Sequence, residues 1–314
     1  MTLSILIVNW RSKDYLRRCL LTIAETCADL DLQIIVVDGG SFDGCGEMLA
    51  AEFPEVDFVQ SPDNVGFGRS NNLGFERVTG AALLLLNPDT ELKNGAVQKM
   101  LNELYASARA GIIGPRLLNT DGSLQVYCVR ALPTPLNRAL DSDFLRRLWP
   151  NSRLWGVAEA FRSSKPVSVE AVSGACMLLR SEIFRRVGGF SPQFFMYGED
   201  MDLCAKVGRR GLQVVHVPDA VVVHHGGGSS GGQVNHFSTS KMREAWDTYM
   251  QLNHGPFTVI AYRFLQAISA VVRLCVLVPG SVLLAGPHRA AARVGLIKWW
   301  CVLKWALCSR PTEQ

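Results

Sequence analysis

The sequence predicts an α/β fold with a mostly parallel central sheet and helices on both faces of that sheet. Short, continuous apolar runs alternate with stretches of helical periodicity through the first 120 residues. Unbroken apolar strands are typical of parallel sheets buried on both faces, and alternation of strand with helix is typical of the connections between parallel strands. Polar residues follow each run directly, at the edge of the sheet where ligands of such folds bind.

Four strands are expected in the first third of the chain, at residues 3–8, 33–38, 57–60 and 82–86. A helix is predicted between the first two, because apolar residues recur there at helical spacing. A further strand at residues 111–118 leads into a hairpin with Asp121 and Gly122 at its turn. Residues 129–166 contain four prolines and are expected to be irregular. The regular pattern returns at residues 169–179, with a helix at 181–187, a helix that begins at Glu199 and a strand at 213–225.

Length, composition and charge limit the class of protein. A chain of 314 residues predicts two domains, and 48% hydrophobic with 19% charged residues predicts a globular protein. Residues 1–255 carry two more acids than bases, which argues against a nucleic-acid binder. No basic segment precedes the first apolar run, so no signal peptide is expected, and the odd number of nine cysteines is interpreted as reduced thiols in a cytoplasmic protein.

Two polar residues at the ends of the first two strands are candidates for nucleotide binding. Asp38 is placed to accept hydrogen bonds from a nucleoside, and Gly40 lets the backbone approach a ligand closely. Asn9, at the end of the first strand, is assigned to the same site. An aspartate that only caps the following helix is the alternative. A dinucleotide-binding domain is disfavoured because the turn after the first strand, NWRSKD, has no glycine.

The loop NVGFGRSNNLG, at residues 64–74, combines glycines with amide side chains. Amides both donate and accept hydrogen bonds, so the loop suits a polar nucleotide or sugar. An ordinary junction between a loop and a helix is the alternative interpretation. The residues assigned to nucleotide binding are Asn64, Gly66, Asn71 and Asn72.

A site for Mg²⁺ or Mn²⁺ is predicted after the fourth strand. Asp89 and Glu91 offer carboxylate oxygens, which these cations prefer together with phosphate oxygens. His224 and His225 end a later strand, and one of them is expected to complete the site, because neighbours on a strand face opposite ways. A solvated turn and a surface histidine pair are the alternatives.

Three acids fall within four residues in the segment FFMYGEDMDLC: Glu199, Asp200 and Asp202. Acids at a helix N-terminus are common because they interact favourably with the helix dipole. An ionised aspartate held against a hydroxyl can also act as a general base. Glu199 and Asp200 are therefore assigned as catalytic candidates.

Seven segments, taken in order, resemble the inverting family-2 glycosyltransferases with the GT-A fold, and among these the rhamnosyltransferase-like branch. They cover residues 1 to about 230 and read SILIVNW, VVDGGSFDG, NVGFGRSNNLG, LLLNPDTEL, SGACMLLRSEIF, GGFSPQFFMYGEDMDLC and VVVHHGGGSS. Two positions depart from the family pattern: Gly39 stands where asparagine is usual, and Ser70 where glycine is usual. These departures bear on the identity of the donor.

The resemblance implies a GT-A nucleotide-diphospho-sugar transferase and a role for individual residues. Asp38 would bind the nucleotide, and Asp89 the cation that bridges the donor diphosphate, so that Asp89 also belongs to the nucleotide site. Asp200 would be the catalytic base, and His224 or His225 would join the cation.

The implied reaction is inverting transfer from a nucleotide-sugar, a dTDP-rhamnose or a UDP-sugar, to a saccharide or lipid-linked acceptor in cell-surface polysaccharide assembly. Gly174 and Asp202 are assigned to acceptor binding. A processive polysaccharide synthase is disfavoured because the chain has no Q-x-x-R-W motif and no series of long spanning helices. A non-catalytic sugar-nucleotide-binding or scaffold protein of the same fold is the alternative function.

Residues 256–314 are expected to form a separate, basic and apolar helical segment, with seven bases and one acid. Within residues 257–278 the polar side chains form a narrow stripe on an apolar helix, and Pro279 is expected to end that helix. Tryptophans mixed with lysines at 294–307 are typical of helices at a membrane surface. We expect attachment to the inner face of the cell membrane; packing on the catalytic domain or in a homo-oligomer is the alternative.

Overall fold

The computed structural model describes residues 2–226, 236–283 and 285–308. The chain divides into two compact units, one of Met1–Leu132 with Asn151–Gln233 and one of Pro133–Pro150 with Val234–Gln314. This division differs from the expected boundary after residue 255 in two ways. Residues Pro133–Pro150, which interrupt the first unit in sequence, belong to the second unit, and the second unit begins before α10 (His236–His254).

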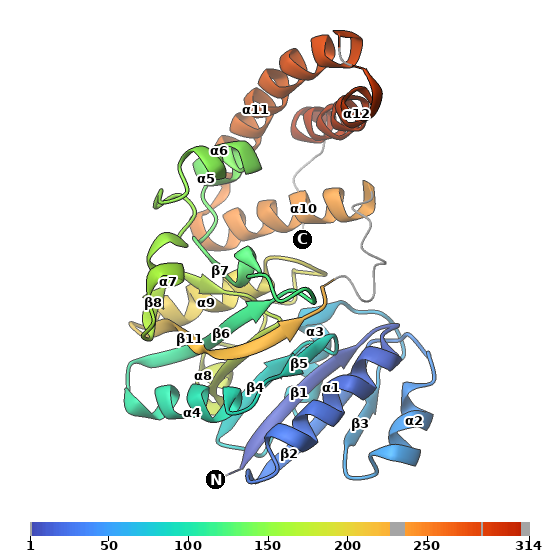
Figure 1. Ribbon diagram of the computed structural model, residues 1–314, viewed down its shortest axis with the longest axis vertical. Helices are drawn as coiled ribbons and strands as arrows, with labels where there is room; N and C mark the ends of the chain where they lie inside the picture. Colours follow the sequence, from blue (N-terminus) through green and yellow to red (C-terminus); the bar gives the residue numbers. More distant parts are fainter. Residues whose placement is uncertain (1, 227–235, 284, 309–314) are drawn as a thin grey trace. The chain divides into compact units, whose positions relative to one another are not determined.

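The first unit is built on a nine-stranded sheet in the order β3-β2-β1-β4-β10-β6-β11-β5, with β8 paired to β11 (Figure 1). The strands are β1 (Leu3–Asn9), β2 (Leu32–Asp38), β3 (Asp57–Gln60), β4 (Ala82–Leu86), β5 (Thr90–Leu92), β6 (Ala110–Leu118), β8 (Val167–Val169), β10 (Cys176–Arg180) and β11 (Gln213–His224). Strands β1 to β4 pair in parallel, as do β6 and β11, whereas β10 runs antiparallel to both of its neighbours. The predicted α/β fold with a mostly parallel sheet is confirmed, with the antiparallel strands β5, β8 and β10 added to it.

Helices cover both faces of the sheet, with α1 and α4 on the near face in Figure 1 and α3, α8 and α9 behind it. The helices of this unit are α1 (Lys13–Thr26), α2 (Cys45–Glu52), α3 (Phe67–Phe75), α4 (Ala96–Ala106), α7 (Ala158–Arg162), α8 (Ser181–Arg186) and α9 (Glu199–Arg209), with a 3₁₀ turn at Val126–Cys128. A small second sheet pairs β7 (Val129–Arg130) with β9 (Ala171–Val172).

The core lies between the central strands and these helices. Every residue of β1 and of β4 is buried, as the apolar runs predict. Burial of each such leucine or isoleucine stabilises the fold by about 1.5–3 kcal/mol. Gly74 allows α3 to lie directly on the sheet, since a Cβ there would stand 2.3 Å from Leu6 Cδ1. This close packing fixes the asparagine-rich helix α3 against β1 and β2.

The second unit is helical. Its members are α5 (Pro135–Leu140), α6 (Asp143–Leu148), α10, α11 (Pro256–Leu283) and α12 (Gly286–Cys308). The stretch 129–166, which was expected to be irregular, therefore contains the short strand β7 and the three short helices α5, α6 and α7, of which α5 begins at a capping box on Thr134. Ser269 Oγ of α11 donates to the carbonyl of Ala139 at 2.8 Å, which ties α5 to α11.

The expectation that α11 ends near Pro279 is wrong, because the helix continues through this proline to Leu283. A proline inside a helix costs roughly 3 kcal/mol through one lost hydrogen bond and a steric clash. Packing against α12 offsets this cost: Leu277 lies so close to Gly295 that a Cβ there would stand 3.1 Å from its Cδ1. The resulting 28-residue helix is, by length and composition alone, long and apolar enough to cross a membrane.

Candidate active site

The ends of β1 and β2 bring the first two predicted residues together. Asn9 and Asp38 are register partners in the parallel pair, and Asn9 Nδ2 donates to Asp38 Oδ1 at 3.0 Å. Both side chains are fully buried. The same amide lies 3.2 Å from each carboxylate oxygen of Asp43, so it bridges two acids.

The Asp38 carboxylate holds the turn that follows β2. Its Oδ2 accepts hydrogen bonds from the backbone N–H groups of Ser41 and Phe42, both at 3.0 Å, and from Gln60 Nε2 at 2.8 Å. Its Oδ1 also accepts from Ser41 Oγ at 2.5 Å. Burial alone would raise the pKa of Asp38, but these hydrogen bonds outweigh burial and lower it below its ordinary value. The geometry assigns Asp38 a turn-holding role, and contact with a nucleotide remains a prediction.

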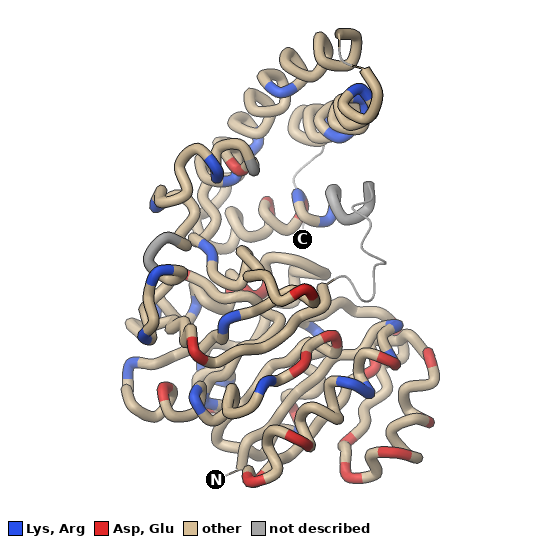
Figure 2. Tube along the Cα trace, viewed as in Figure 1, with Lys and Arg blue, Asp and Glu red and all other residues tan. Residues whose placement is uncertain are grey.

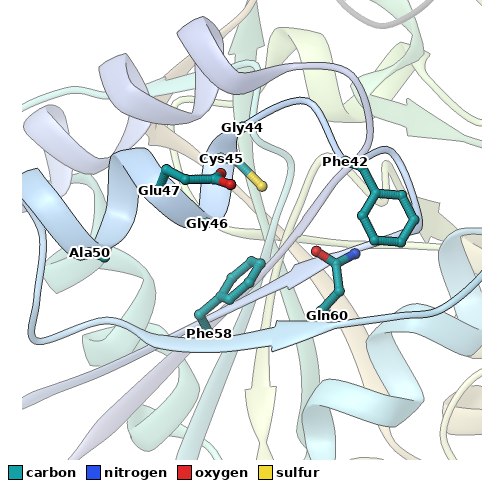
Figure 3. A pocket seen from close by; sticks show the side chains of 8 residues that line it. All are labelled: Phe42, Gly44, Cys45, Gly46, Glu47, Ala50, Phe58 and Gln60. Atoms are coloured by element: carbon teal, nitrogen blue, oxygen red, sulfur yellow. The ribbon is translucent and has the colours of Figure 1, made fainter.

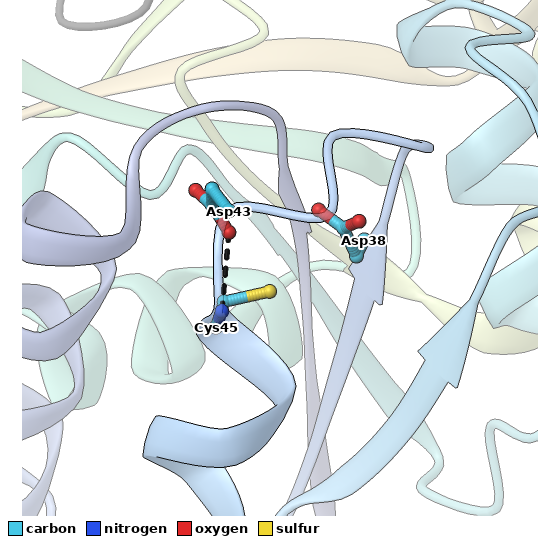
Figure 4. Close-up of side chains that lie close together, drawn as sticks. All are labelled: Asp38, Asp43 and Cys45. Atoms are coloured by element: carbon cyan, nitrogen blue, oxygen red, sulfur yellow. Dashed lines mark hydrogen bonds between the residues drawn. The ribbon is translucent and has the colours of Figure 1, made fainter.

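Asp38, Asp43 and Cys45 form a cluster of groups that could ligate a metal ion (Figure 4). Burial, followed by the charges of the two aspartates, raises the pKa of Cys45, so its thiol stays protonated at neutral pH. The Asn9 amide donates to both carboxylates. A protonated thiol and two carboxylates already bonded to protein donors fit Mg²⁺ or Mn²⁺ poorly, since these ions prefer free oxygen ligands.

A cavity of about 400 Å³ opens beside this turn, between α2 and β3 (Figure 3). Phe42 and Phe58 are its aromatic walls, and Gln60 presents a side-chain amide at one end. Gly40 lies in the same turn with φ +77°, and a Cβ there would stand 2.5 Å from the backbone carbon of Asp63. The turn after β2 therefore fits closely against the loop after β3.

The asparagine-rich loop is fastened to the segment that precedes α9. Asn72 exchanges two hydrogen bonds with the backbone of Phe190, at 2.8 and 2.9 Å. Gly66 has φ +89°, and a Cβ there would lie 2.2 Å from the carbonyl oxygen of Phe195. Asn71 is buried and donates to the carbonyl of Phe67. These asparagines hold backbone in place, and Asn64, which is exposed, also accepts a hydrogen bond from the backbone N–H of Gly66 at 3.1 Å, so its contact with a nucleotide stays a prediction.

Asp89 and His224 meet at the end of β4, as predicted for a cation site. Asp89 Oδ1 lies 3.2 Å from His224 Nε2, because β5 and the end of β11 pair antiparallel and place Thr90 opposite His224. The other ring nitrogen, Nδ1, lies 2.8 Å from Gln125 Oε1. With that oxygen as acceptor, Nδ1 carries the proton and the lone pair of Nε2 faces a carboxylate oxygen. This arrangement fits a positive charge between the two atoms.

Glu91 and His225 form a second pair beside the first. His225 Nε2 lies 2.8 Å from Glu91 Oε1, and the same carboxylate makes ion pairs with Arg18 and Lys93. Burial would raise the pKa of Glu91, but the hydrogen bond from His225 and the charge of Arg18 lower it. The structure thus divides the four predicted ligands into two pairs, of which Asp89 and His224 have the geometry for a cation.

The acidic helix α9 starts at Glu199, as predicted, after Gly198 with φ +83°. Asp200 Oδ2 accepts a hydrogen bond from the backbone N–H of Gly174 at 3.0 Å, and Oδ1 from that of Met201 at 2.8 Å. Glu199 is 8% exposed, and its Oε2 reaches no hydrogen-bond partner in the described part of the chain. Burial, with the charge of Asp200 next, raises the pKa of Glu199 to about 8. Glu199 is therefore mostly protonated at neutral pH.

A series of contacts connects Asp200 with His224, the histidine of the predicted cation site. Gly174 donates to Asp200, the carbonyl of the next residue, Ala175, accepts from the backbone N–H of Asn87, and Asn87 Nδ2 lies 3.4 Å from His224 Nε2. The two predicted centres, 111 residues apart between Asp89 and Asp200, thus lie at one edge of the sheet. The predicted base and the predicted cation ligands, if they lie at the same edge, suit two ends of one substrate.

Asp202 lies away from this chemistry. It is 1% exposed and accepts from Ser191 Oγ at 2.6 Å, with Lys206 Nζ at 3.3 Å. Its predicted contact with the acceptor stays a prediction, and its visible contacts hold α9 to the preceding loop. Gly174 by contrast lies directly on Asp200, since a Cβ there would stand 3.1 Å from Asp200 Cβ.

Three residues that orient the site were not identified from the sequence. Asp43 fixes Asn9, Gln60 bonds to Asp38, and Gln125 holds His224. Asp43 falls in the motif VVDGGSFDG, which could have indicated it. Gln125 has no such signal, because it lies 99 residues from His224 in sequence.

Comparison with known proteins identifies the family and agrees with the fold. Residues 4–188 match the family model described as glycosyl transferase family 2, and residues 151–307 match the one described as glycosyl transferase family group 2. An N-acetylglucosaminyl-diphospho-decaprenol L-rhamnosyltransferase of Mycobacterium tuberculosis is 28% identical over 243 residues, which cover 73% of this chain and 78% of that protein. The rhamnosyltransferase WbbL of Escherichia coli K12 is 26% identical, with coverage of 70% and 82%.

Solved structures share the fold. The mannosyltransferase PcManGT from Pyrobaculum calidifontis, in complex with GDP-Man and Mn²⁺, superposes with a TM-score of 0.60 at 17% identity, covering 97% of this chain and 87% of that chain. GalNAc-T7 with UDP, GalNAc and Mn²⁺ superposes with a TM-score of 0.57 at 15% identity, covering 80% of this chain and 48% of that chain. Both likenesses concern the fold.

Proposed function

The chain belongs to glycosyl transferase family 2 and to its rhamnosyltransferase-like branch, and from this premise we propose that it transfers a rhamnose-like sugar with inversion. The donor is a dTDP- or UDP-sugar, and the acceptor is a saccharide or a lipid-linked saccharide. The product belongs to cell-surface polysaccharide assembly, and the enzyme works at the cytoplasmic face of the membrane.

The approach of Asp89 to His224 is the observation that carries this proposal. A carboxylate oxygen and an imidazole nitrogen 3.2 Å apart form a two-ligand site that leaves other positions for phosphate oxygens. Mg²⁺ or Mn²⁺ bound there would offset the negative charge of the departing nucleoside diphosphate. Gln125 and Asn87 orient the histidine.

Asp200 is the proposed base. The two backbone N–H groups that bond to its oxygens fix the carboxylate in one orientation. From there it accepts the proton of an acceptor hydroxyl, whose oxygen forms the new bond to the anomeric carbon as the bond to the diphosphate breaks. Attack from the face opposite the leaving group inverts the configuration. Glu199 stays neutral, which avoids a second negative charge beside the base.

The names of a similar protein and of a solved structure with the same fold support the choice of substrates. The Mycobacterium tuberculosis relative is named for an acceptor that joins a sugar to a lipid through a diphosphate, and for rhamnose as the sugar transferred. The archaeal structure was determined with a nucleotide-sugar and Mn²⁺.

A thermal-shift titration with dTDP and UDP, with and without Mn²⁺, tests the proposal. A ligand present at about 100 times its Kd stabilises the folded state by about 2.7 kcal/mol, which raises the melting temperature by roughly 5–10 °C. Asp89→Asn should abolish the Mn²⁺-dependent part of this shift, and the matched variant Asp219→Asn, on the exposed part of β11, should preserve it. Glu91→Gln shows in the same assay whether Glu91 is a ligand. If no nucleotide stabilises the folded wild-type protein, the proposal is contradicted and a non-catalytic protein of the same fold is the better-supported function.

A further inference from the structure

The second unit contains two arginines that converge on one tryptophan. The guanidinium of Arg273, in α11, lies 4.0 Å from the ring centre of Trp299 in α12, and that of Arg243, in α10, lies 5.9 Å from the same ring. Neither takes part in any ion pair between described residues. By contrast, Arg263 pairs with Asp247, and Arg146 with Asp141. We call Arg243, Arg273, Trp299 and Gln266 the arginine site.

Two half-buried guanidinium groups close together are electrostatically unfavourable, and the charge of Asp141, which favours the cationic form of Arg273, does not outweigh burial and the charge of Arg243. Burial, with the charge of Arg243 next, lowers the pKa of Arg273. Arg273 Nη2 donates to the backbone carbonyl of Asp141 at 2.9 Å. An anion bound between the two guanidinium groups would remove their repulsion, and two planar guanidinium groups suit phosphate oxygens.

A buried donor without a partner lies beside these arginines. Gln266 is fully buried, and its Oε1 accepts a hydrogen bond from Arg243 Nη1 at 3.1 Å. Its Nε2 has no hydrogen-bond partner in the described part of the chain. Gln266 and Arg273 are seven residues apart in α11 and so share one face of the helix. An unpartnered buried amide is costly, and an oxygen-rich anion would satisfy it.

The opposite face of α11 carries no polar group. Every exposed position from Pro256 to Leu283 is occupied by proline, phenylalanine, isoleucine, alanine, valine, cysteine or leucine. Phe257 is 85% exposed, Phe264 65% and Val276 70%. Figure 2 shows that the charges of α11 and α12 are cations, and no acid lies between residues 256 and 308. An apolar face of this length on a cationic hairpin is complementary to a lipid that bears negative charge.

We propose that the arginine site binds the diphosphate of a lipid-linked acceptor, and that the exposed apolar face of α11 contacts the hydrocarbon of that lipid and its membrane. This inference rests on the proposed function, which calls for a lipid-linked acceptor, and it assigns the residues that hold the lipid end of that acceptor. Cations and apolar surface together fit an amphiphile with a phosphorylated head better than they fit either a free phosphate or an uncharged lipid.

Binding of farnesyl diphosphate to the full-length chain tests the proposal by titration calorimetry and by the fluorescence of Trp299 and its neighbours. The double variant Arg243→Gln/Arg273→Gln should bind about tenfold or more weakly than wild type, because both charged contacts are lost. The matched variant Arg289→Gln/Arg293→Gln removes the same charge from α12 and should bind within about twofold of wild type. Equal loss in both variants would show a general charge effect and overturn the site.

Two further probes separate the sources of the phosphate. Inorganic pyrophosphate should bind at least about tenfold more weakly than farnesyl diphosphate, and equal affinity would refute the role of the apolar face. Phosphatidylglycerol vesicles should not compete for the arginine site, and full competition would replace the acceptor by an anionic membrane surface. If the double glutamine variant unfolds, Arg273→Lys keeps the charge but loses the planar fork, and it should still weaken farnesyl diphosphate binding.

Donor binding is the control that keeps this inference separate from the proposed function. The arginine variants should retain the Mn²⁺-dependent shift by nucleoside diphosphate, because no arginine of this site belongs to the first unit. If wild type shows no Mn²⁺-dependent thermal shift, the proposed function is contradicted. If wild type shows this shift but does not bind farnesyl diphosphate, only the arginine site is contradicted.

Discussion

Replacement of Asp38 by asparagine should destabilise the first unit strongly, because the carboxylate holds the turn after β2. Five donors bond to it: the Asn9 amide, the Ser41 backbone and hydroxyl, the Phe42 backbone and the Gln60 amide. Asparagine keeps one acceptor oxygen but turns an amide donor toward groups that themselves donate. It also removes the negative charge that strengthens each bond.

The size of the effect follows from these contacts. Hydrogen bonds to a charged group contribute about 1.5–3 kcal/mol and neutral ones about 1 kcal/mol, so four or five weakened bonds amount to about 3 kcal/mol after allowance for non-additivity. For a unit of this size, that loss lowers the melting temperature by roughly 6–12 °C. Asp57→Asn is the matched control, because Asp57 pairs with Arg77 at the surface of β3, where an ion pair contributes about 0–1 kcal/mol.

Thermal and urea unfolding, followed by circular dichroism, measure this effect, and its pH dependence identifies the charge. The pKa of Asp38 in the folded state lies below its ordinary value of 3.8. Its contribution to stability is therefore fully present above about pH 4 and is lost as pH falls through the folded-state pKa. The difference between wild type and Asp38→Asn should stay constant from pH 7 to about 5 and shrink below pH 4. A variant that melts within about 1 °C of wild type at pH 7 would refute the reasoning.

Three more predictions concern the base and its surroundings. Asp200→Asn should lower sugar transfer by roughly 10²–10⁴-fold while nucleotide binding persists, as measured by release of nucleoside diphosphate and by calorimetry; near-normal turnover would exclude Asp200 as the base. Glu199→Gln should stabilise the protein at pH 8, with a gain that grows from pH 5 to 8, because burial and the charge of Asp200 raise the pKa of Glu199 on folding and wild type loses stability over that range; a flat difference in urea unfolding would contradict this. Gly66→Ala should cost about 2–4 kcal/mol through its positive φ and its clash with the Phe195 carbonyl, whereas Gly122→Ala, also at positive φ but in open space, should cost about 1 kcal/mol; equal melting temperatures would count against the close fit at Gly66.

The contrast between Asp89 and Glu91 shows what local sequence patterns can predict and what they cannot. Asp89 and Glu91 are two residues apart and chemically alike as candidate ligands. Their difference arises only in the fold, where Glu91 meets Arg18 and Lys93 while Asp89 meets His224. Lys93 is a local partner of Glu91, but the contacts of Glu91 with Arg18 and of Asp89 with His224 join residues more than 70 positions apart, which depend on strand order and which no local spacing encodes.

The same limit applies to the C-terminal helices. The narrow polar stripe of α11 correctly marks the side that faces its own unit, where Arg263 meets Asp247 and Ser269 meets Ala139. The sequence did not indicate that residues 133–150 join this unit, because a contact across more than 120 residues has no periodic signal. The sequence also did not predict that α11 continues through Pro279, because proline has a low helix propensity. The packing of α11 on α12 offsets the cost of this proline.

The sequence by itself determined strands β1 to β4, the start of α9 and the residue types at the sheet edge, since these depend on local periodicity and on residue chemistry, whereas β5 and the division of residues 167–180 into β8, β9 and β10 were not expected. Tertiary structure decided which partners each of those residues meets. Asp38 is saturated by five donors, whereas the Nε2 of His224 faces Asp89. The physical reason is that hydrogen bonds and ion pairs form within about 3 to 4 Å, and only the folded chain brings distant residues to that range.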